Sequence, residues 1–233
     1  MKIKSFFLKE TNQRKLKYYA SYTFGLSLKK QKKYCFGWIV SPKWVDNLIS
    51  DFNKKNEIRP ILLDNGAFTA WKLNKKIPCI EHIELQKKCY QKIIANNIKI
   101  NGIIIPDTVG DGKDTLKKIE VFQQYKYYDN TIAFACIQEN MNIDVFLNIC
   151  NKNTFGIFIG GKSKEWKYYI IKQIKEKKFN GKIHFGRAST DLDLYICSKN
   201  KIDSFDNSTY MNGLNRKNLP LYIERLKKYA IKK

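Results

Sequence analysis

The chain has 233 residues, 43% of them hydrophobic and 14% aromatic, which is enough to bury a full core as one domain. No segment approaches the length of a membrane span, and Met1–Glu10 contains too short an apolar run for a signal peptide. These features argue against a membrane-spanning or secreted protein. We therefore expect a soluble, cytoplasmic one.

The chain is strongly basic: 44 Lys and Arg residues stand against 21 Asp and Glu residues, for a formal net charge of +23 at pH 7. Lys and Arg side chains release counterions when they bind phosphates, so this excess favours a nucleic acid as the partner. The alternative is a compositional bias of the source toward Lys, Asn and Ile. Charge alone does not choose between the two.

The cysteine pattern predicts no metal centre. Six cysteines are scattered without a Cys-x-x-Cys pair, and the only histidines are His82 and His184. This spacing supports neither a zinc site nor a disulfide framework. We therefore expect reduced thiols, with Cys136 a buried thiol inside an apolar run.

Short apolar runs alternate with longer helical patterns along the chain. The runs are almost continuously apolar, which is typical of parallel strands covered on both faces. The predicted strands are Ile3–Leu8, Cys35–Val40, Pro60–Leu63, Gly102–Ile105, Thr131–Ile137, Phe155–Ile159, Lys182–Phe185 and Ile202–Phe205.

Helices are predicted between several of these strands. Ser41 and Pro42 have the character of a cap and a first-turn proline, and they open a helix over Trp44–Phe52. Apolar residues at helical spacing, preceded in one case by the capping residue Ser163, predict the others. These lie over Ile80–Ile98, around Leu116, Ile119 and Phe122, over Trp166–Ile174 and over Leu219–Ala230.

Eight strands, each followed by a helix, predict a (β/α)8 barrel that occupies residues 1–233 as one domain. A doubly wound open sheet has the same alternation and is the alternative. The barrel is favoured because the number of predicted strands is eight.

The predicted strands end in polar residues that would meet in a barrel, because its active site lies at the carboxyl ends of the strands. Carboxylates there accept hydrogen bonds from an amine and a ring nitrogen, a glutamine donates to a carbonyl oxygen, and glycines leave their amides free. This set predicts a pocket for a planar heterocycle rich in hydrogen-bond donors. The residues are Asp64, Asp107, Gln138, Gly160, Gly161, Gly186 and Asp206.

Five short motifs at these strand ends occur in a recognisable order: Asp64-Asn65-Gly66-Ala67-Phe68, Pro106-Asp107, Gln138, Gly160-Gly161 and Ile202-Asp203-Ser204-Phe205-Asp206. Together they resemble the motifs of the tRNA-guanine transglycosylase superfamily, whose members exchange guanine for a 7-deazaguanine in nucleic acid. The resemblance covers the barrel strands across most of the chain.

The resemblance implies a role for each motif. Asp206 would be the nucleophile that attacks the anomeric carbon, expels guanine and holds the sugar covalently. Asp64 would manage the proton of the incoming base. Two displacements at one carbon retain the configuration, no cofactor is needed, and the target nucleotide must be flipped out or unpaired. The residues implied to bind the base are Asn65, Gly66, Phe68, Asp107, Gln138, Gly160 and Gly161.

The chain also departs from the family. Nothing after Asp206 contains a cysteine or a histidine, so we expect the zinc-binding segment of the family's tRNA enzymes to be absent. Asn65 replaces the serine of the family motif and Ala67 replaces its second glycine, and both changes bear on which base is accepted. A compact, zinc-free chain fits the branch that inserts deazaguanines into DNA, so DNA is favoured over tRNA as the substrate.

Each of these residues also has a plain structural explanation. Asn65-Gly66 is a strong turn signal, Gly160-Gly161 can cap a strand, and Asp203 is expected to be structural and paired with a nearby lysine. His184 is expected to be a core histidine.

Arg187 follows the seventh strand, where barrels often bind phosphate, and is a candidate phosphate contact.

Two other functions stay open at this point. A non-catalytic barrel subunit would bind nucleic acid or a partner protein, and a base-removing N-glycosidase would use the same carboxylates with water as the acceptor. The presence of both Asp64 and Asp206 favours an enzyme over a non-catalytic subunit. The expected ligands are DNA and a guanine or 7-deazaguanine base. Whether the protein also has a partner subunit stays open.

Overall fold

The computed structural model describes residues 16–22, 35–125, 127–128, 130–207, 224 and 227–229. The strands are β1 (Lys17–Ser21), β2 (Gly37–Val40), β3 (Ile61–Leu63), β4 (Ile100–Ile104), β5 (Ile132–Ile137), β6 (Gly156–Ile159), β7 (Ile183–Phe185) and β8 (Ser204–Asn207). The helices are the 3-10 turn η1 (Pro42–Trp44) and α2 (Val45–Lys55), α3 (Ala67–Lys72), α4 (Cys79–Ala95), α5 (Gly112–Phe122), α6 (Ile143–Asn153), α7 (Lys164–Glu176) and α8 (Asp191–Lys199).

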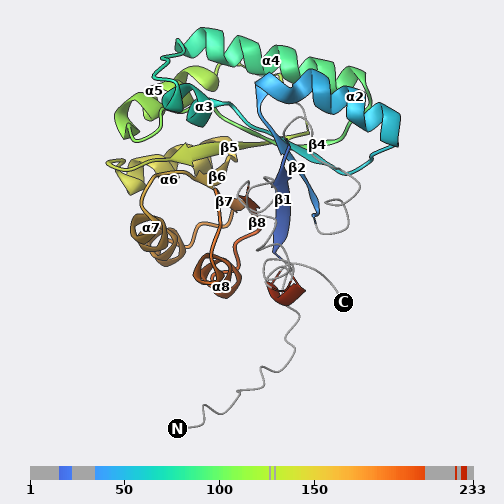
Figure 1. Cartoon of the computed structure of the whole chain (residues 1–233). Helices are drawn as coiled ribbons and strands as arrows, with labels where there is room; N and C mark the ends of the chain where they lie inside the picture. The colour runs from blue at the N-terminus through green and yellow to red at the C-terminus, as the bar shows by residue number, and fades with distance from the viewer. Residues whose placement is uncertain are drawn as a thin grey trace.

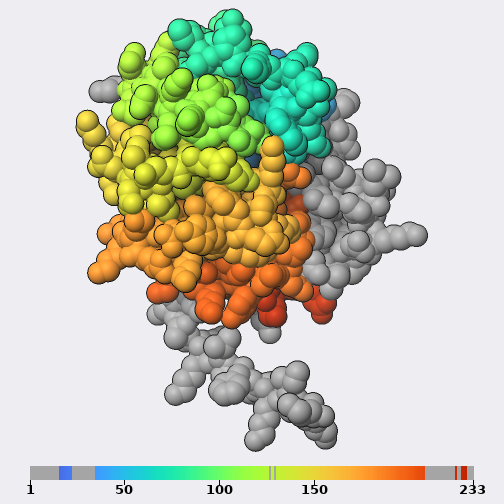
Figure 2. All heavy atoms as spheres, turned by 90° about the vertical axis from the view of Figure 1, so that its left-hand side faces the viewer, coloured from blue at the N-terminus to red at the C-terminus, as the bar shows by residue number. Residues whose placement is uncertain are grey.

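The eight strands form a closed, parallel barrel in sequence order. Figure 1 shows the helices α2 to α8 following one another around the outside of the strands. From the side, the same succession is visible as adjoining bands of colour from green to orange (Figure 2). The predicted (β/α)8 barrel is confirmed. Among the described residues, no helix combines the length and the apolar character needed to cross a membrane.

The first barrel strand is not the one predicted. β1 pairs with β2 on one side and with β8 on the other, which closes the barrel. The predicted first strand, Ile3–Leu8, lies outside the described residues, and the first place in the barrel is taken by β1, which was not predicted. β1 is hard to see in the sequence because it has polar ends and no β-branched residue. Its packing comes from tyrosines, and the ring of Tyr18 stacks on Phe205 with 5.1 Å between the centroids.

The other seven predicted strands are confirmed, with ends within two residues of those expected. The predicted helix over Trp44–Phe52 corresponds to α2, which follows a 3-10 turn that begins at Pro42. Ser163 caps α7 as expected, because its hydroxyl accepts a hydrogen bond from a backbone N–H of the first turn. The predicted helix over Leu219–Ala230 lies largely outside the described residues.

Two helices that the apolar pattern does not predict begin at polar capping residues. The side chain of Asn142 accepts hydrogen bonds from two amides in the first turn of α6. Thr190 and Asp193 form a reciprocal capping box at the start of α8. Such caps satisfy backbone N–H groups that have no partner inside a helix.

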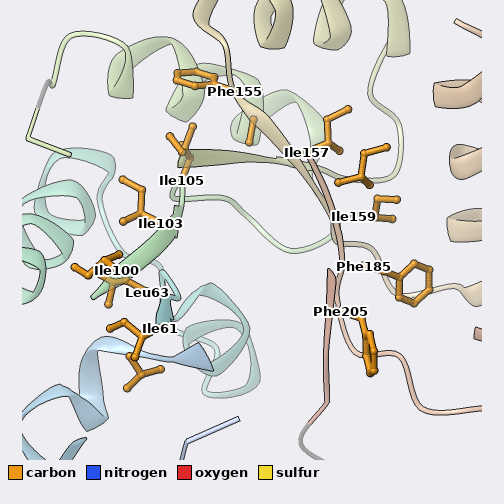
Figure 3. Close-up of a cluster of buried hydrophobic side chains, with 14 of the residues drawn as sticks. Ile61, Leu63, Ile100, Ile103, Ile105, Phe155, Ile157, Ile159, Phe185 and Phe205 are labelled. Atoms are coloured by element: carbon orange, nitrogen blue, oxygen red, sulfur yellow. The ribbon is translucent and has the colours of Figure 1, made fainter. Parts of the chain in front are cut away.

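The buried side chains form two layers, because successive residues of a strand point to opposite faces. The outer layer lies between the strands and the helices and includes Ile61, Leu63, Ile103, Ile157, Ile159, Phe185 and Phe205 (Figure 3). The inner layer fills the barrel and consists of Tyr19, Ile39, Leu62, Ile104, Phe134, Cys136 and Phe158. Side chains therefore fill the interior of the barrel, and this packing holds the strand ends in fixed positions.

Phe134 fits into the inner layer because two neighbouring strands carry glycine beside it. A Cβ added to Gly102 on β4 would lie 2.6 Å from the Phe134 ring, and one added to Gly156 on β6 would lie 2.7 Å from it. The small residues on both sides leave room for the large ring between them.

We expect Gly102→Ala to lower the free energy of unfolding by about 1–3 kcal/mol, the usual cost of overpacking. Phe134→Leu makes room for the added methyl group, so the double variant should lose less than the sum of the two single losses. Urea unfolding of the wild type and the three variants measures this coupling. Additive losses would contradict the packing of the inner layer.

Candidate active site

A cavity of about 420 Å³ lies where the strands end. The carboxyl ends of β3 to β8 face the same side of the barrel, so residues from distant parts of the chain meet there. Every residue predicted to form the site lines the cavity, with the exception of Gly66. These residues are Asp64, Asn65, Phe68, Asp107, Gln138, Gly160, Gly161, Gly186, Arg187 and Asp206.

Asp206 on β8 is buried, and two donors hold one of its carboxylate oxygens. Nε2 of His184 lies 3.0 Å from Oδ1, and the backbone N–H of Arg187 donates to the same oxygen over 3.1 Å. Oδ2 makes no hydrogen bond to any described residue. The carboxylate is therefore fixed through one oxygen, while the other oxygen is available to react.

His184 on β7 is fully buried, as expected for a core histidine, but it also belongs to the site. Its Nδ1 lies 2.9 Å from the hydroxyl of Ser204, and its ring stacks on Phe158 with 5.0 Å between the centroids. A carboxylate can only accept a hydrogen bond, so Nε2 carries the proton shared with Asp206. In the neutral ring Nδ1 then accepts from Ser204, and this hydroxyl fixes the tautomer.

Asp64, directly after β3, holds its proton unusually strongly. Burial and the negative charges of Asp107 and Asp206 raise the pKa of Asp64 to about 7. Hydrogen bonds from the backbone amides of Asn65 and Gly66 offset part of this rise. A carboxyl group with a pKa near neutrality is protonated in about half of the molecules at pH 7, so it can both donate and accept a proton.

Asp107, after β4, is buried and held by two side-chain amides. Nδ2 of Asn65 donates to Oδ1 over 2.7 Å, and Nε2 of Gln138 donates to Oδ2 over 2.5 Å. Burial raises the pKa of Asp107, and these two hydrogen bonds act in the opposite direction. Asn65 and Gln138, predicted to contact the base, thus fix the Asp107 carboxylate in this structure.

The two glycine amides at the end of β6 are engaged within the protein. The N–H of Gly160 donates to the carbonyl of Ile137, and the N–H of Gly161 donates to Oε1 of Gln138 over 3.1 Å. A Cβ on Gly160 would lie 2.6 Å from Nε2 of Gln138, and one on Gly161 would lie 2.5 Å from the Trp166 ring. Both amides, expected to be free for a base, are thus hydrogen-bonded within the protein, and the one of Gly161 helps to position Gln138.

Gly66 does not line the cavity but shapes the turn that carries Asp64. Its φ of +79° lies in the left-handed region that glycine adopts without strain, and it precedes the first residue of α3. Oδ1 of Asn65 accepts from the backbone N–H of Ala67 over 2.7 Å, and the Asn65 carbonyl accepts from Nε2 of His82. The structural explanation of Asn65-Gly66 as a turn therefore holds, and the same turn forms one wall of the site.

Two basic side chains reach the cavity from α7 and from the end of β7. Lys167 is buried, and its Nζ donates to the carbonyl of Gly186 over 2.8 Å. Burial lowers the pKa of Lys167 to about 8, although the charge of Asp206 acts in the opposite direction. Arg187 is exposed, has a φ of +61°, and places its guanidinium 4.3 Å from the ring centroid of Phe68.

Asp203 is structural, as predicted. Its carboxylate accepts a hydrogen bond from Lys182 over 3.0 Å and another from the backbone N–H of Ile183 over 3.0 Å. It therefore ties the start of β7 to β8.

In the described ranges, no group of three or more His, Cys, Asp or Glu side chains is placed to hold a metal ion.

No protein-family model matches the chain, and no curated protein matches it. The function proposed for the chain rests on the residues of the site and on their geometry: a (β/α)8 barrel with three carboxyl groups at one mouth.

We expect Asp64→Asn to stabilise the protein at neutral pH. The pKa of Asp64 is raised from 3.8 to about 7 on folding, so the folded state binds its proton more tightly than the unfolded state. That contribution to stability is complete below about pH 4 and is lost as the pH rises through about 7. The melting temperature of Asp64→Asn relative to the wild type should therefore increase over this range.

Thermal unfolding at several pH values measures this difference. Glu120→Gln on the exposed face of α5 removes one negative charge away from the cavity and serves as the control. A difference between Asp64→Asn and the wild type that does not change with pH would contradict the raised pKa.

Proposed function

We propose that the protein is a base-exchanging glycosyltransferase, which replaces guanine in nucleic acid with a 7-deazaguanine through a covalent Asp206–sugar intermediate. The observation that carries the proposal is a pair of carboxyl groups in one cavity. Asp206 has one fixed oxygen and one available oxygen, and Asp64 has a pKa of about 7. Base exchange requires a nucleophile and a proton carrier of this kind.

In the first displacement, Oδ2 of Asp206 forms a bond to the anomeric carbon C1′, and the bond from C1′ to N9 of guanine breaks. The electron pair of that bond leaves with the base, and protonated Asp64 supplies the proton to N9. Guanine leaves as a neutral molecule, Asp64 becomes a carboxylate, and the sugar is an ester of Asp206. His184 and the Arg187 amide already hold Oδ1, so the attack needs little reorientation.

In the second displacement, a 7-deazaguanine occupies the place that guanine has left. Its N9–H gives the proton to Asp64, N9 forms the new bond to C1′, and Asp206 is released as a carboxylate. Two inversions at C1′ retain the configuration of the sugar. Both carboxyl groups return to their first protonation state, so the exchange needs no cofactor.

The cavity suits a flat, purine-like base. Its volume of about 420 Å³ is in the range of small-molecule sites. Ile104, Cys136 and Phe158 contribute apolar wall, and Asp107 offers its carboxylate oxygens to N–H groups of the base. Each of these oxygens has a second lone pair besides the one used by Asn65 or Gln138.

DNA is the nucleic acid that we propose as the substrate. The net charge of +23 provides attraction to a phosphate backbone. The sugar of a nucleotide inside a duplex cannot reach Asp206, so the target nucleotide is unpaired or flipped out. The proposal allows the protein to act alone or with a partner subunit.

The proposal is tested by offering radiolabelled guanine together with duplex DNA, single-stranded DNA or tRNA. We expect label to enter DNA with the wild type and not with Asp206→Asn. Asp203→Asn, which removes an acid just before β8 and outside the cavity, is the matched control and should retain exchange. An abasic product without label would indicate the N-glycosidase, and binding without either product would indicate a non-catalytic subunit.

His184→Phe is expected to slow the exchange by about 100-fold, since it keeps a ring on Phe158 but removes the donor that holds Oδ1 of Asp206. His184→Gln can place an amide N–H near the position of Nε2 and should recover part of the rate. Binding of free guanine should change little in either variant, because His184 does not line the cavity. Equal rates for the two variants, or a loss confined to guanine binding, would contradict a positioning role for His184.

A further inference from the structure

Trp71 on α3 stands between two cavities and has no part in the exchange reaction. Its side chain is 42% exposed, which is unusual for so large an apolar group. It lines the active-site cavity and also a second cavity of about 690 Å³. Asp107 and Val109 also line both cavities, so the two adjoin each other along this wall.

Exposed lysines surround Trp71. Lys72 follows it on α3, Lys75 and Lys76 line the second cavity, and Lys162 reaches across from the end of β6. Nζ of Lys162 lies 4.8 Å from the ring centroid of Trp71. Within the described part of the chain, none of these four lysines forms an ion pair with a carboxylate. The surface therefore combines an aromatic ring with four lysines that have no carboxylate partner among the described residues. Asp107, Asp111 and Asp114 also line the second cavity, and of these Asp114 pairs with Lys118.

We propose that Trp71 is a stacking platform for the base of the nucleotide next to the exchanged one in an unpaired DNA strand. Lys72, Lys75, Lys76 and Lys162 bind the phosphates on either side of that nucleotide. The choice of exchanged nucleotide rests on the proposed function, but binding at Trp71 does not require the exchange chemistry.

Three features fit this ligand. An exposed indole ring beside lysines is the combination that binds single-stranded nucleic acid, since every base has a face to stack and every linkage has a charge to neutralise. Phe68 and Trp71 both line the active-site cavity, with their ring centroids 5.6 Å apart, so a base stacked on Trp71 would lie beside that cavity, as the neighbour of the exchanged nucleotide requires. The second cavity gives the stacked nucleotide space beyond the ring.

The platform is tested by binding a short, fluorescein-labelled single-stranded DNA to the full chain carrying Asp206→Asn, which prevents turnover. Adding Trp71→Ala should weaken binding by about tenfold, and Trp71→Phe should retain most of the affinity, because the stacked ring supplies the energy. Tyr195→Ala is the matched control. Tyr195 on α8 is 48% exposed and has Nζ of Lys199 5.9 Å from its ring centroid, but it lines neither cavity.

The phosphate contacts are tested by the salt dependence of the same binding. Lys162→Ala should reduce the slope of log Kd against log salt concentration by about 0.7, the value for one phosphate contact on a single strand. Lys152→Ala, at the end of α6 on the opposite side of the barrel from the strand ends, should leave the slope unchanged. Equal slopes in the two variants would exclude Lys162 from the phosphate site.

The platform is overturned if Trp71→Ala and Tyr195→Ala bind with equal affinity while both retain the melting temperature of the parent. It is also overturned if Trp71→Ala weakens the binding of duplex DNA as much as that of single-stranded DNA. Tighter, Trp71-dependent binding of a single-stranded RNA of the same sequence would overturn the assignment to DNA. Failure of the proposed function looks different: the wild type would incorporate no label, while the loss of binding in Trp71→Ala would persist.

Discussion

Three carboxyl groups share one cavity, and the distribution of hydrogen-bond donors among them decides what each can do. Asp107 receives two side-chain amides, and Asp206 receives His184 and a backbone N–H. Among the described residues, Asp64 accepts hydrogen bonds only from backbone amides and lies near the charges of the other two, and its pKa is raised to about 7. In the proposed reaction the same residue type supplies a nucleophile, a receptor for the base and a proton carrier, because its surroundings differ at each strand end.

The packed interior of the barrel fixes the position of the Asp206 carboxylate. The ring of His184 stacks on Phe158 and lies against Tyr19 and Phe134, with centroids 6.0 Å and 6.2 Å away. A buried ring that is packed on its faces and bonded at both nitrogens has a single orientation, and it transmits that orientation to Asp206. Burial also makes the ionised form of Asp64 unfavourable, which lowers the stability of the folded protein above the pKa of this group. Functional sites commonly reduce stability in this way.

Most of the barrel and the convergence of the strand ends could be predicted from the sequence, because parallel strands are continuous apolar runs and a barrel brings their ends to one mouth. Strand β1 could not be predicted, because its buried residues are mainly tyrosines and both of its ends are polar. His184 and Lys167 were not predicted to belong to the site, because their positions there depend on contacts between different helices and strands. The remaining signals are weak: His184 and Asp206 point inward on neighbouring strands, and Lys167 interrupts the apolar stripe of α7. Which amides are already hydrogen-bonded cannot be read from spacing at all.

The central claim is that Asp206 forms a covalent bond to the sugar of a nucleotide. The most direct test incubates the protein with single-stranded DNA, quenches the mixture in denaturant, and measures the mass of the intact product before mapping the modified peptide. We predict an adduct that survives denaturation, has the mass of protein plus DNA minus guanine, and is attached at Asp206. An adduct on another residue, or guanine exchange that proceeds without any adduct, would contradict the claim.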